Sequence, residues 1–218
     1  MRARSLVPSV VRLAFAAAAV VAITYQLAVL HAHGVLRPGN FFSFFTIQSN
    51  VLAACLLALL AMVRRAERTP AVEIVRGAVT LYISITGAVF ALLLDGHQEA
   101  VQTAVPWVDT IVHRVIPLAV LVDWIADPPR RRLPRRVAVL WLAYPAAWFA
   151  YTLARGAAEG WYPYPFVDVT SLGYGGVIAR AAVPLPCFAV AALAVAAIGN
   201  ARTPQTGPAT VVGAPAAE

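Results

Sequence analysis

Charged residues are scarce in this sequence, and lysine is absent from it. Only 12% of the 218 residues are charged, whereas 61% are hydrophobic, and the mean hydropathy is +0.74. Soluble globular domains carry about 25% charged residues, so this composition excludes a soluble globular protein. It predicts an all-α integral membrane protein, because a helix satisfies its own backbone hydrogen bonds in lipid.

Cysteine is also scarce, and several familiar motifs are missing. Cys55 and Cys187 lie in apolar runs without CxxC spacing, which predicts buried thiols rather than a zinc site or a disulfide. The histidines form no HExxH or CxxCH motif, so we expect neither a metal nor another cofactor. The absence of a glycine-rich phosphate loop argues against a nucleotide-driven pump, and the absence of an internal repeat counts against a secondary transporter.

Six apolar runs are each long enough to cross a hydrocarbon core of about 30 Å, which takes roughly 20 helical residues. The sequence therefore predicts one domain, a polytopic bundle of six transmembrane helices over residues 1–199. The rest of the chain, 200–218, is rich in Pro, Gly, Thr and Ala, and it predicts a disordered cytoplasmic tail. The six spans lie near 10–30, 41–63, 74–95, 107–126, 137–155 and 175–198.

All 17 basic residues are arginine, and they gather at alternate connections between the spans. Groups of arginine precede the first span and follow the second and the fourth, whereas the other connections hold few. Short cytoplasmic loops collect basic residues, so both termini are predicted to be cytoplasmic in a multi-pass protein of the cell membrane. We interpret the net charge of +7 as contact with anionic membrane lipids. The sequence contains no basic domain with interleaved aromatic residues, so it does not indicate nucleic-acid binding.

Polar side chains cluster at the outer end of the second span, in the stretch FFSFFTIQSN at 41–50. On one continuous helix Ser43, Thr46 and Asn50 follow at i, i+3 and i+7 and share a face. We expect that face to look into the bundle, because lipid leaves hydroxyl and amide groups without hydrogen bonds. Thr46 is then roughly 7–8 Å below the outer boundary.

The fourth span places a histidine at a matching depth. His113 is roughly 9–10 Å from the outer boundary, and Asp109 is one helical turn closer to the surface, on the same face. A hydroxyl, a histidine and an acid are the parts of a nucleophile, its base and an orienting group. A structural interpretation stays open: Thr46 ties helices together, His113 is a satisfied interior histidine, and Asp109 pairs with an arginine.

Further ionisable groups share the outer leaflet. Arg114 follows His113, Arg180 is in the sixth span, and Asp95 ends the third. Ionisable groups at membrane depth indicate function. We predict that Ser43, Asn50, Arg114 and Arg180 bind substrate in an outer-facing pocket, with Asn50 or Arg114 stabilising an oxyanion.

The last outer connection, RGAAEGWYPYPFVDVTSLGY at 155–174, combines prolines with aromatic residues. Proline stiffens the backbone, and aromatic rings favour the level of the lipid headgroups. Two interpretations remain open: the segment covers the mouth of the bundle, or it only anchors the protein at the interface.

Several separated motifs carry a resemblance to known proteins: FFTIQSN, VHRVIPLAVLVDW with the following DPPRRR, WLAYPAAWFAYTLARG and GWYPYPFVDV. Over about residues 10–198, their order resembles the Pr-six-Pr family of bacterial integral membrane proteins. The architecture is more distantly similar to the androgen-induced and androgen-dependent membrane proteins, six-span enzymes that hydrolyse fatty acid esters of hydroxy fatty acids. That family uses a threonine nucleophile in its second span and a histidine in its fourth. By position, the resemblance implies Thr46 and His113.

Two functions therefore stand as hypotheses, beside the third possibility of an assembly or structural subunit. The first is an intramembrane hydrolase of lipid (fatty acyl) esters, in which Thr46 attacks the acyl carbonyl, His113 takes its proton and Asp109 orients the imidazole. The second is a non-catalytic membrane protein that binds or transports a small amphiphile through the same pocket, with Arg114 and Arg180 as anion contacts.

Overall fold

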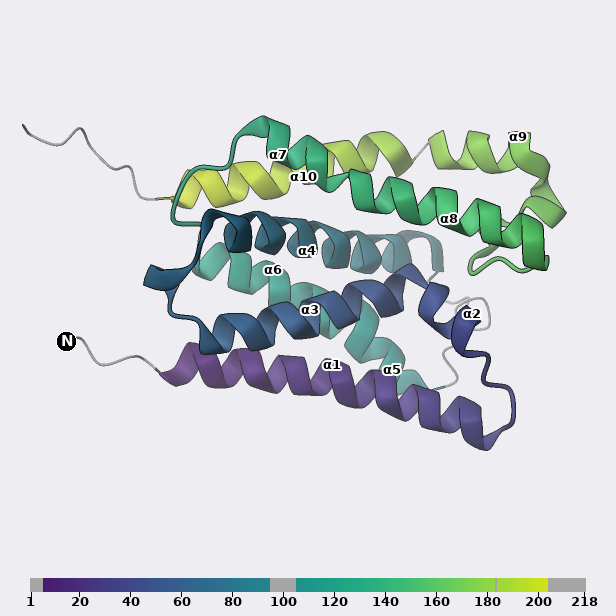
Figure 1. Ribbon diagram of the computed structural model, residues 1–218, viewed down its shortest axis with the longest axis horizontal. Helices are drawn as coiled ribbons and strands as arrows, with labels where there is room; N and C mark the ends of the chain where they lie inside the picture. The colour runs from purple at the N-terminus through teal and green to yellow at the C-terminus, as the bar shows by residue number, and fades with distance from the viewer. Residues whose placement is uncertain (1–5, 95–104, 183, 204–218) are drawn as a thin grey trace, which may run out of the picture.

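The computed structural model describes residues 6–94, 105–182 and 184–203 (Figure 1). Within these ranges every regular element is helical, which confirms the predicted all-α class. The first half of the chain contains α1 (Leu6–Ala32), α2 (Pro38–Ser43), α3 (Phe45–Met62), the 3₁₀ turn η1 (Arg65–Glu67), α4 (Pro70–Val89) and the π-helical turn η2 (Phe90–Leu94). The second half contains α5 (Pro106–Thr110), the π-helical turn η4 (Ile111–Val115), α6 (Ile116–Ala126), α7 (Arg135–Trp141), α8 (Ala143–Glu159), the 3₁₀ turn η5 (Pro165–Val167), α9 (Val169–Ala182) and α10 (Pro184–Arg202).

Five helical segments are long and apolar enough to cross a membrane: Leu6–Ala32, Phe45–Met62, Pro70–Leu92, Arg135–Glu159 and Val169–Arg202. The predicted span 107–126 corresponds to the consecutive elements α5, η4 and α6. This segment is more polar than the others, because Asp109, Arg114 and Asp123 all fall within it. The last helix ends at Arg202, so the first residues of the predicted tail are helical, and 204–218 are outside the described residues.

The predicted helix 41–63 is broken at Phe44, which has extended backbone angles. Side chains from elsewhere take the backbone groups that the break releases. Trp148 Nε1 donates to the Ser43 carbonyl, Gln48 Nε2 donates to the Phe42 carbonyl, and the Thr46 N–H donates to Tyr164 Oη. Because buried backbone groups need partners, these contacts make the break tolerable inside the bundle. The expectation that Ser43 shares a helix face with Thr46 is therefore wrong.

The helices pack lengthwise, and Figure 1 shows that the start of α1 and the end of α10 lie at the same end of the bundle. That end also holds η1 and the connection from α6 to α7. The opposite end holds α2, α5, the end of α8 and the start of α9. Residue 44, where α2 meets α3, is thus far along the bundle from the arginine-rich connections.

A buried ion network joins four segments at the first of these ends. Asp127 accepts from Arg12 at 2.6 Å, from Arg68 at 2.7 Å and from Arg65 at 2.9 Å. Arg76 contacts Asp123 at 3.1 Å, and Asp123 also contacts Arg12 at 2.7 Å. The sequence predicts contact with lipid headgroups for the arginines that flank the spans. Arg12 and Arg68, with Arg76, instead turn into the bundle, where they pair with the partly buried carboxylates of Asp123 and Asp127.

Both cysteines differ from expectation as well. Cys55 and Cys187 are exposed on the surface of the bundle rather than buried. Apolar helices need no polar outer face in lipid, so exposure of a thiol on such a surface carries little cost.

Candidate active site

Thr46, His113 and Asp109 form a connected chain of side chains at the end of the bundle opposite the ion network. Thr46 Oγ1 is 3.3 Å from His113 Nε2, and His113 Nδ1 is 2.9 Å from Asp109 Oδ1. An ionised carboxylate only accepts, so Nδ1 carries the proton and donates to Asp109. Nε2 is then the acceptor that faces the Thr46 hydroxyl. All three residues are buried, with 8%, 3% and 4% exposure.

A π-helical turn carries the histidine. In η4 the Ile116 N–H bonds to the Ile111 carbonyl, five residues earlier, and such turns recur at functional sites. The Asn50 amide nitrogen supports this irregular turn from α3, because it donates to the Val112 carbonyl at 3.0 Å. Its second bond, 2.9 Å long, goes to the Thr46 carbonyl. Asn50 therefore links the helix of Thr46 to the turn of His113.

The same two bonds limit what Asn50 does chemically. An amide nitrogen has two hydrogens, and both are engaged by backbone carbonyls. In this geometry Asn50 has no hydrogen left to donate to an oxyanion, one of the two roles predicted for Asn50 or Arg114.

Phe90 fixes the plane of the imidazole. Its ring, contributed by η2, stacks on His113 with centroids 4.2 Å apart and an interplanar angle of 12°. Arg114 is exposed. Its guanidinium lies over the Phe90 ring, 5.5 Å from the ring centroid. Arg114 thus contacts the aromatic ring that stacks on the histidine.

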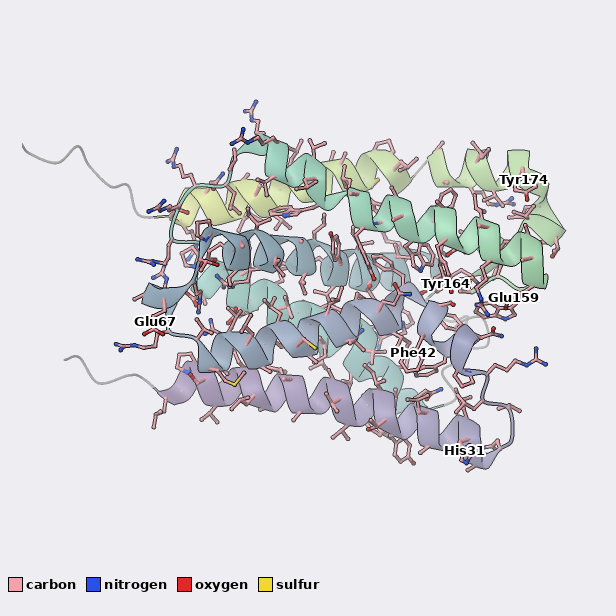
Figure 2. The ribbon with its side chains drawn as sticks, in the orientation of Figure 1. His31, Phe42, Glu67, Glu159, Tyr164 and Tyr174 are labelled. Atoms are coloured by element: carbon pink, nitrogen blue, oxygen red, sulfur yellow. The ribbon has the colours of Figure 1, made fainter. Side chains whose placement is uncertain are left out.

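Tyr164 is the main residue that sequence reasoning missed. Its hydroxyl is 3.3 Å from Thr46 Oγ1 and accepts from the Thr46 N–H at 3.3 Å. Tyr164 is 5% exposed, and Figure 2 shows it between the end of α8 and the junction of α2 with α3. Burial raises the pKa of Tyr164, so the phenol keeps its proton. The YPYP stretch was a usable signal, because a rigid aromatic segment beside a polar cluster has few ways to pack.

The segment 160–168 that carries Tyr164 is held against α8. The Tyr162 ring packs on Gly156, where any side chain would collide with it. The Gly160 N–H bonds to the Gly156 carbonyl at 2.8 Å, and Gly160 itself has a φ of +66°, which favours glycine. Through the contact of Tyr164 with Thr46 the segment also lies against the site, and its role as a cover stays a prediction.

The remaining predicted residues lie apart from the triad. The Ser43 hydroxyl donates to the Gly39 carbonyl and contacts Tyr151 Oη and Arg155 Nη1. Arg180 is exposed on α9. Asp95 is outside the described residues. Among the described residues, His, Cys, Asp and Glu form no group of three suited to a metal ion.

Comparison of the chain with models of known families, with curated proteins and with solved structures finds no match. The resemblance to the Pr-six-Pr family, and the more distant one to the androgen-induced and androgen-dependent membrane hydrolases, therefore stay predictions from sequence motifs.

Proposed function

We propose that this protein is a cell-membrane hydrolase of fatty acyl esters, with Thr46 as nucleophile, His113 as general base and Asp109 as the orienting carboxylate. One observation carries the proposal: a hydroxyl, an imidazole and a carboxylate meet in one buried chain, with Thr46 Oγ1 3.3 Å from His113 Nε2. A threonine hydroxyl is a weak nucleophile without a base within hydrogen-bonding reach. The described contact provides that base.

In acylation, Thr46 Oγ attacks the carbonyl carbon of the ester while its proton moves to His113 Nε2. The carbonyl π electrons move to the oxygen and form an oxyanion. Asp109 stabilises the imidazolium through the Nδ1 bond. Collapse of the intermediate breaks the bond to the alcohol oxygen, and His113 returns the proton to that oxygen, which leaves acylated Thr46 and a free alcohol.

Deacylation repeats these steps with water. His113 takes a proton from water, the hydroxide oxygen attacks the acyl carbon, and the fatty acid leaves as the Thr46 oxygen regains its proton from His113. The net reaction consumes one ester and one water and yields one alcohol and one acid. The triad ends the cycle in its starting state.

The substrate class follows from the surroundings of the triad. Thr46 neighbours Phe44, Phe45 and Ile47, all buried, and Val112 adjoins His113. Apolar surroundings of this kind favour an aliphatic acyl chain, which gains about 0.8 kcal/mol per buried CH₂. A lipid substrate in the outer leaflet then approaches from the side of the bundle.

The proposal includes six membrane crossings with both termini in the cytoplasm. The segment Pro106–Ala126 is the additional crossing, and its two carboxylates pair inside the bundle: Asp109 with His113, and Asp123 with Arg12 and Arg76. The arginine-rich connections and the ends of α1 and α10 share one end of the bundle, as expected for a cytoplasmic face.

A kinetic experiment tests the proposed activity. Purified protein in detergent or liposomes is assayed with a fluorogenic long-chain acyl ester and with a fluorophosphonate probe. We expect hydrolysis and labelling in the wild type, and loss of both in Thr46→Ala and His113→Ala. Thr24→Ala and His33→Ala serve as matched controls, because Thr24 bonds within its own helix and His33 is exposed at the end of α1.

The rival hypothesis predicts a different outcome. A protein that only binds or transports an amphiphile would bind the ester without hydrolysis or labelling. Its affinity for the ester would be unchanged in Thr46→Ala. Binding of the ester without hydrolysis or labelling would contradict the proposed enzyme.

A further inference from the structure

The proposed hydrolase needs a hydrogen-bond donor for its oxyanion. Removal of one such donor typically costs about 10²–10³ in kcat. Both amide hydrogens of Asn50 are engaged by carbonyls, and Arg114 is over the Phe90 ring. Asn50 therefore has no hydrogen left for an oxyanion in this geometry, and the structure offers another donor beside Thr46.

The directions of the hydrogen bonds around Thr46 point the hydroxyl hydrogen of Tyr164 toward Thr46 Oγ1. The Thr46 hydroxyl donates to His113 Nε2, so Thr46 Oγ1 is the acceptor in its 3.3 Å contact with Tyr164 Oη. Tyr164 Oη in turn accepts from the Thr46 N–H, which uses one of its lone pairs. The phenolic hydrogen thus lies along the line from Oη to the nucleophile oxygen.

The N-terminus of α3 strengthens this arrangement. The helix begins at Phe45, and its N-cap residue Phe44 makes no side-chain capping bond. Tyr164 Oη occupies the position that a capping oxygen would take, since it accepts from the Thr46 N–H. The first backbone N–H groups of a helix favour negative charge nearby. An oxyanion that forms beside Thr46 Oγ1 is therefore close to both the phenol and this helix end.

We propose that Tyr164 is a catalytic residue, whose hydroxyl donates to the oxyanion formed when Thr46 attacks the ester. The inference rests on the proposed function. In the resting protein the phenol donates to Thr46 Oγ1. During attack the negative charge develops on the former carbonyl oxygen, which is bonded to the same carbon as Oγ1 and so lies about 2.3 Å from it. The phenolic hydrogen turns from one oxygen to the other without movement of the ring.

The segment 160–168 thus has two connected roles. Its burial of Thr46 excludes water from the acyl-transfer step, and its tyrosine completes the donor set only when the segment lies against α2 and α3.

Tyr164→Phe tests the inference, because it removes the hydroxyl and keeps the ring that packs on Phe44 and Trp148. We expect kcat for a long-chain acyl ester to fall about 10²-fold or more while KM changes little. Affinity for a long-chain trifluoromethyl ketone, whose adduct with Thr46 carries an oxyanion, should fall by a similar factor. Tyr162→Phe is the matched control, since it removes a hydroxyl from the same segment.

Each outcome decides between specific alternatives. A wild-type enzyme that hydrolyses esters, with Tyr164→Phe equally active, overturns the tyrosine's role and leaves the proposed function intact. Higher activity in Tyr164→Phe also overturns it, because the phenol would then obstruct the site. A wild type without hydrolysis or labelling overturns the proposed function itself. Loss of kcat with unchanged inhibitor affinity contradicts an oxyanion contact.

Discussion

At the scale of single residues, Asp109 has the most sharply defined role. Its carboxylate is 2.9 Å from His113 Nδ1 and sets which imidazole nitrogen is free to act as base. Asp109→Asn keeps the shape but removes the charge that stabilises the imidazolium. We expect kcat for ester hydrolysis to fall about 10²–10⁴-fold. Steady-state kinetics against Asp168→Asn, an acid that bonds Thr170 at the start of α9, checks this. Equal activity of the two variants would contradict the role.

The sequence predicted this triad because helical periodicity alone relates its parts. Asp109 and His113 are four residues apart, so they meet on any helix, and the depth of Thr46 follows from counting residues. Tyr164 could not be placed in this way, because a connection has no fixed rise per residue. The engaged hydrogens of Asn50 were also beyond prediction, since they depend on the carbonyl that the π-helical turn exposes.

At the scale of elements, segment 160–168 packs on α8 and brings Tyr164 to Thr46. A Cβ at Gly156 would collide with the Tyr162 ring, so Gly156→Ala must displace the segment. We expect a loss of about 1–3 kcal/mol in stability and a marked fall in activity. Thermal unfolding and ester hydrolysis together measure both effects. Gly175→Ala is the control, because a Cβ there meets no atom within 4 Å. Identical behaviour of the two variants would contradict the packing described.

The elements themselves were largely predictable, whereas their breaks were not. The apolar runs located each long helix to within a few residues. The break at Phe44 has no proline or glycine to signal it. It depends on Trp148, Gln48 and Tyr164, whose side chains take the released backbone groups. The kink at Gly173, where φ is +66°, has a glycine but no signal that separates it from its glycine neighbours.

At the scale of the whole molecule, the ion network sets stability and its dependence on pH. Burial alone would raise the pKa of Asp127, but hydrogen bonds from Arg68 and Arg12 and the charge of Arg76 hold it below its usual value. Its contribution to folding is therefore complete above the unfolded pKa, about 3.9, and is lost as pH falls through the folded value. Asp127→Asn leaves buried cations without their partner.

We expect Asp127→Asn to lower stability by about 3–5 kcal/mol at neutral pH. The difference from wild type should shrink as the pH falls below about 4, where the carboxylate of the unfolded chain becomes protonated, and should vanish below the lower pKa of the native carboxylate. Thermal unfolding in detergent across this range measures it. Glu67→Gln is the control, because the pair of Glu67 with Arg64 is exposed and worth little. A pH-independent difference would contradict the network's electrostatic role.

The proposed topology makes a separate prediction for the whole chain. Single cysteines replace the exposed Thr170 or Arg131 in a protein carrying Cys55→Ala and Cys187→Ala. A membrane-impermeant maleimide should label Thr170→Cys in intact cells and Arg131→Cys only after the membrane is disrupted. The reverse pattern would invert the topology and move the triad to the cytoplasmic leaflet. The arginine distribution predicted this orientation, whereas it gave no sign that several arginines are buried in ion pairs.

The most direct measurement of the central claim is the position of the covalent adduct. Wild-type protein is treated with a fluorophosphonate carrying a long alkyl chain, digested and mapped by mass spectrometry. The account predicts one adduct on Thr46, absent from His113→Ala and strongly reduced in Asp109→Asn. An adduct on another residue, or an unmodified Thr46 in a protein that hydrolyses the ester, would contradict it.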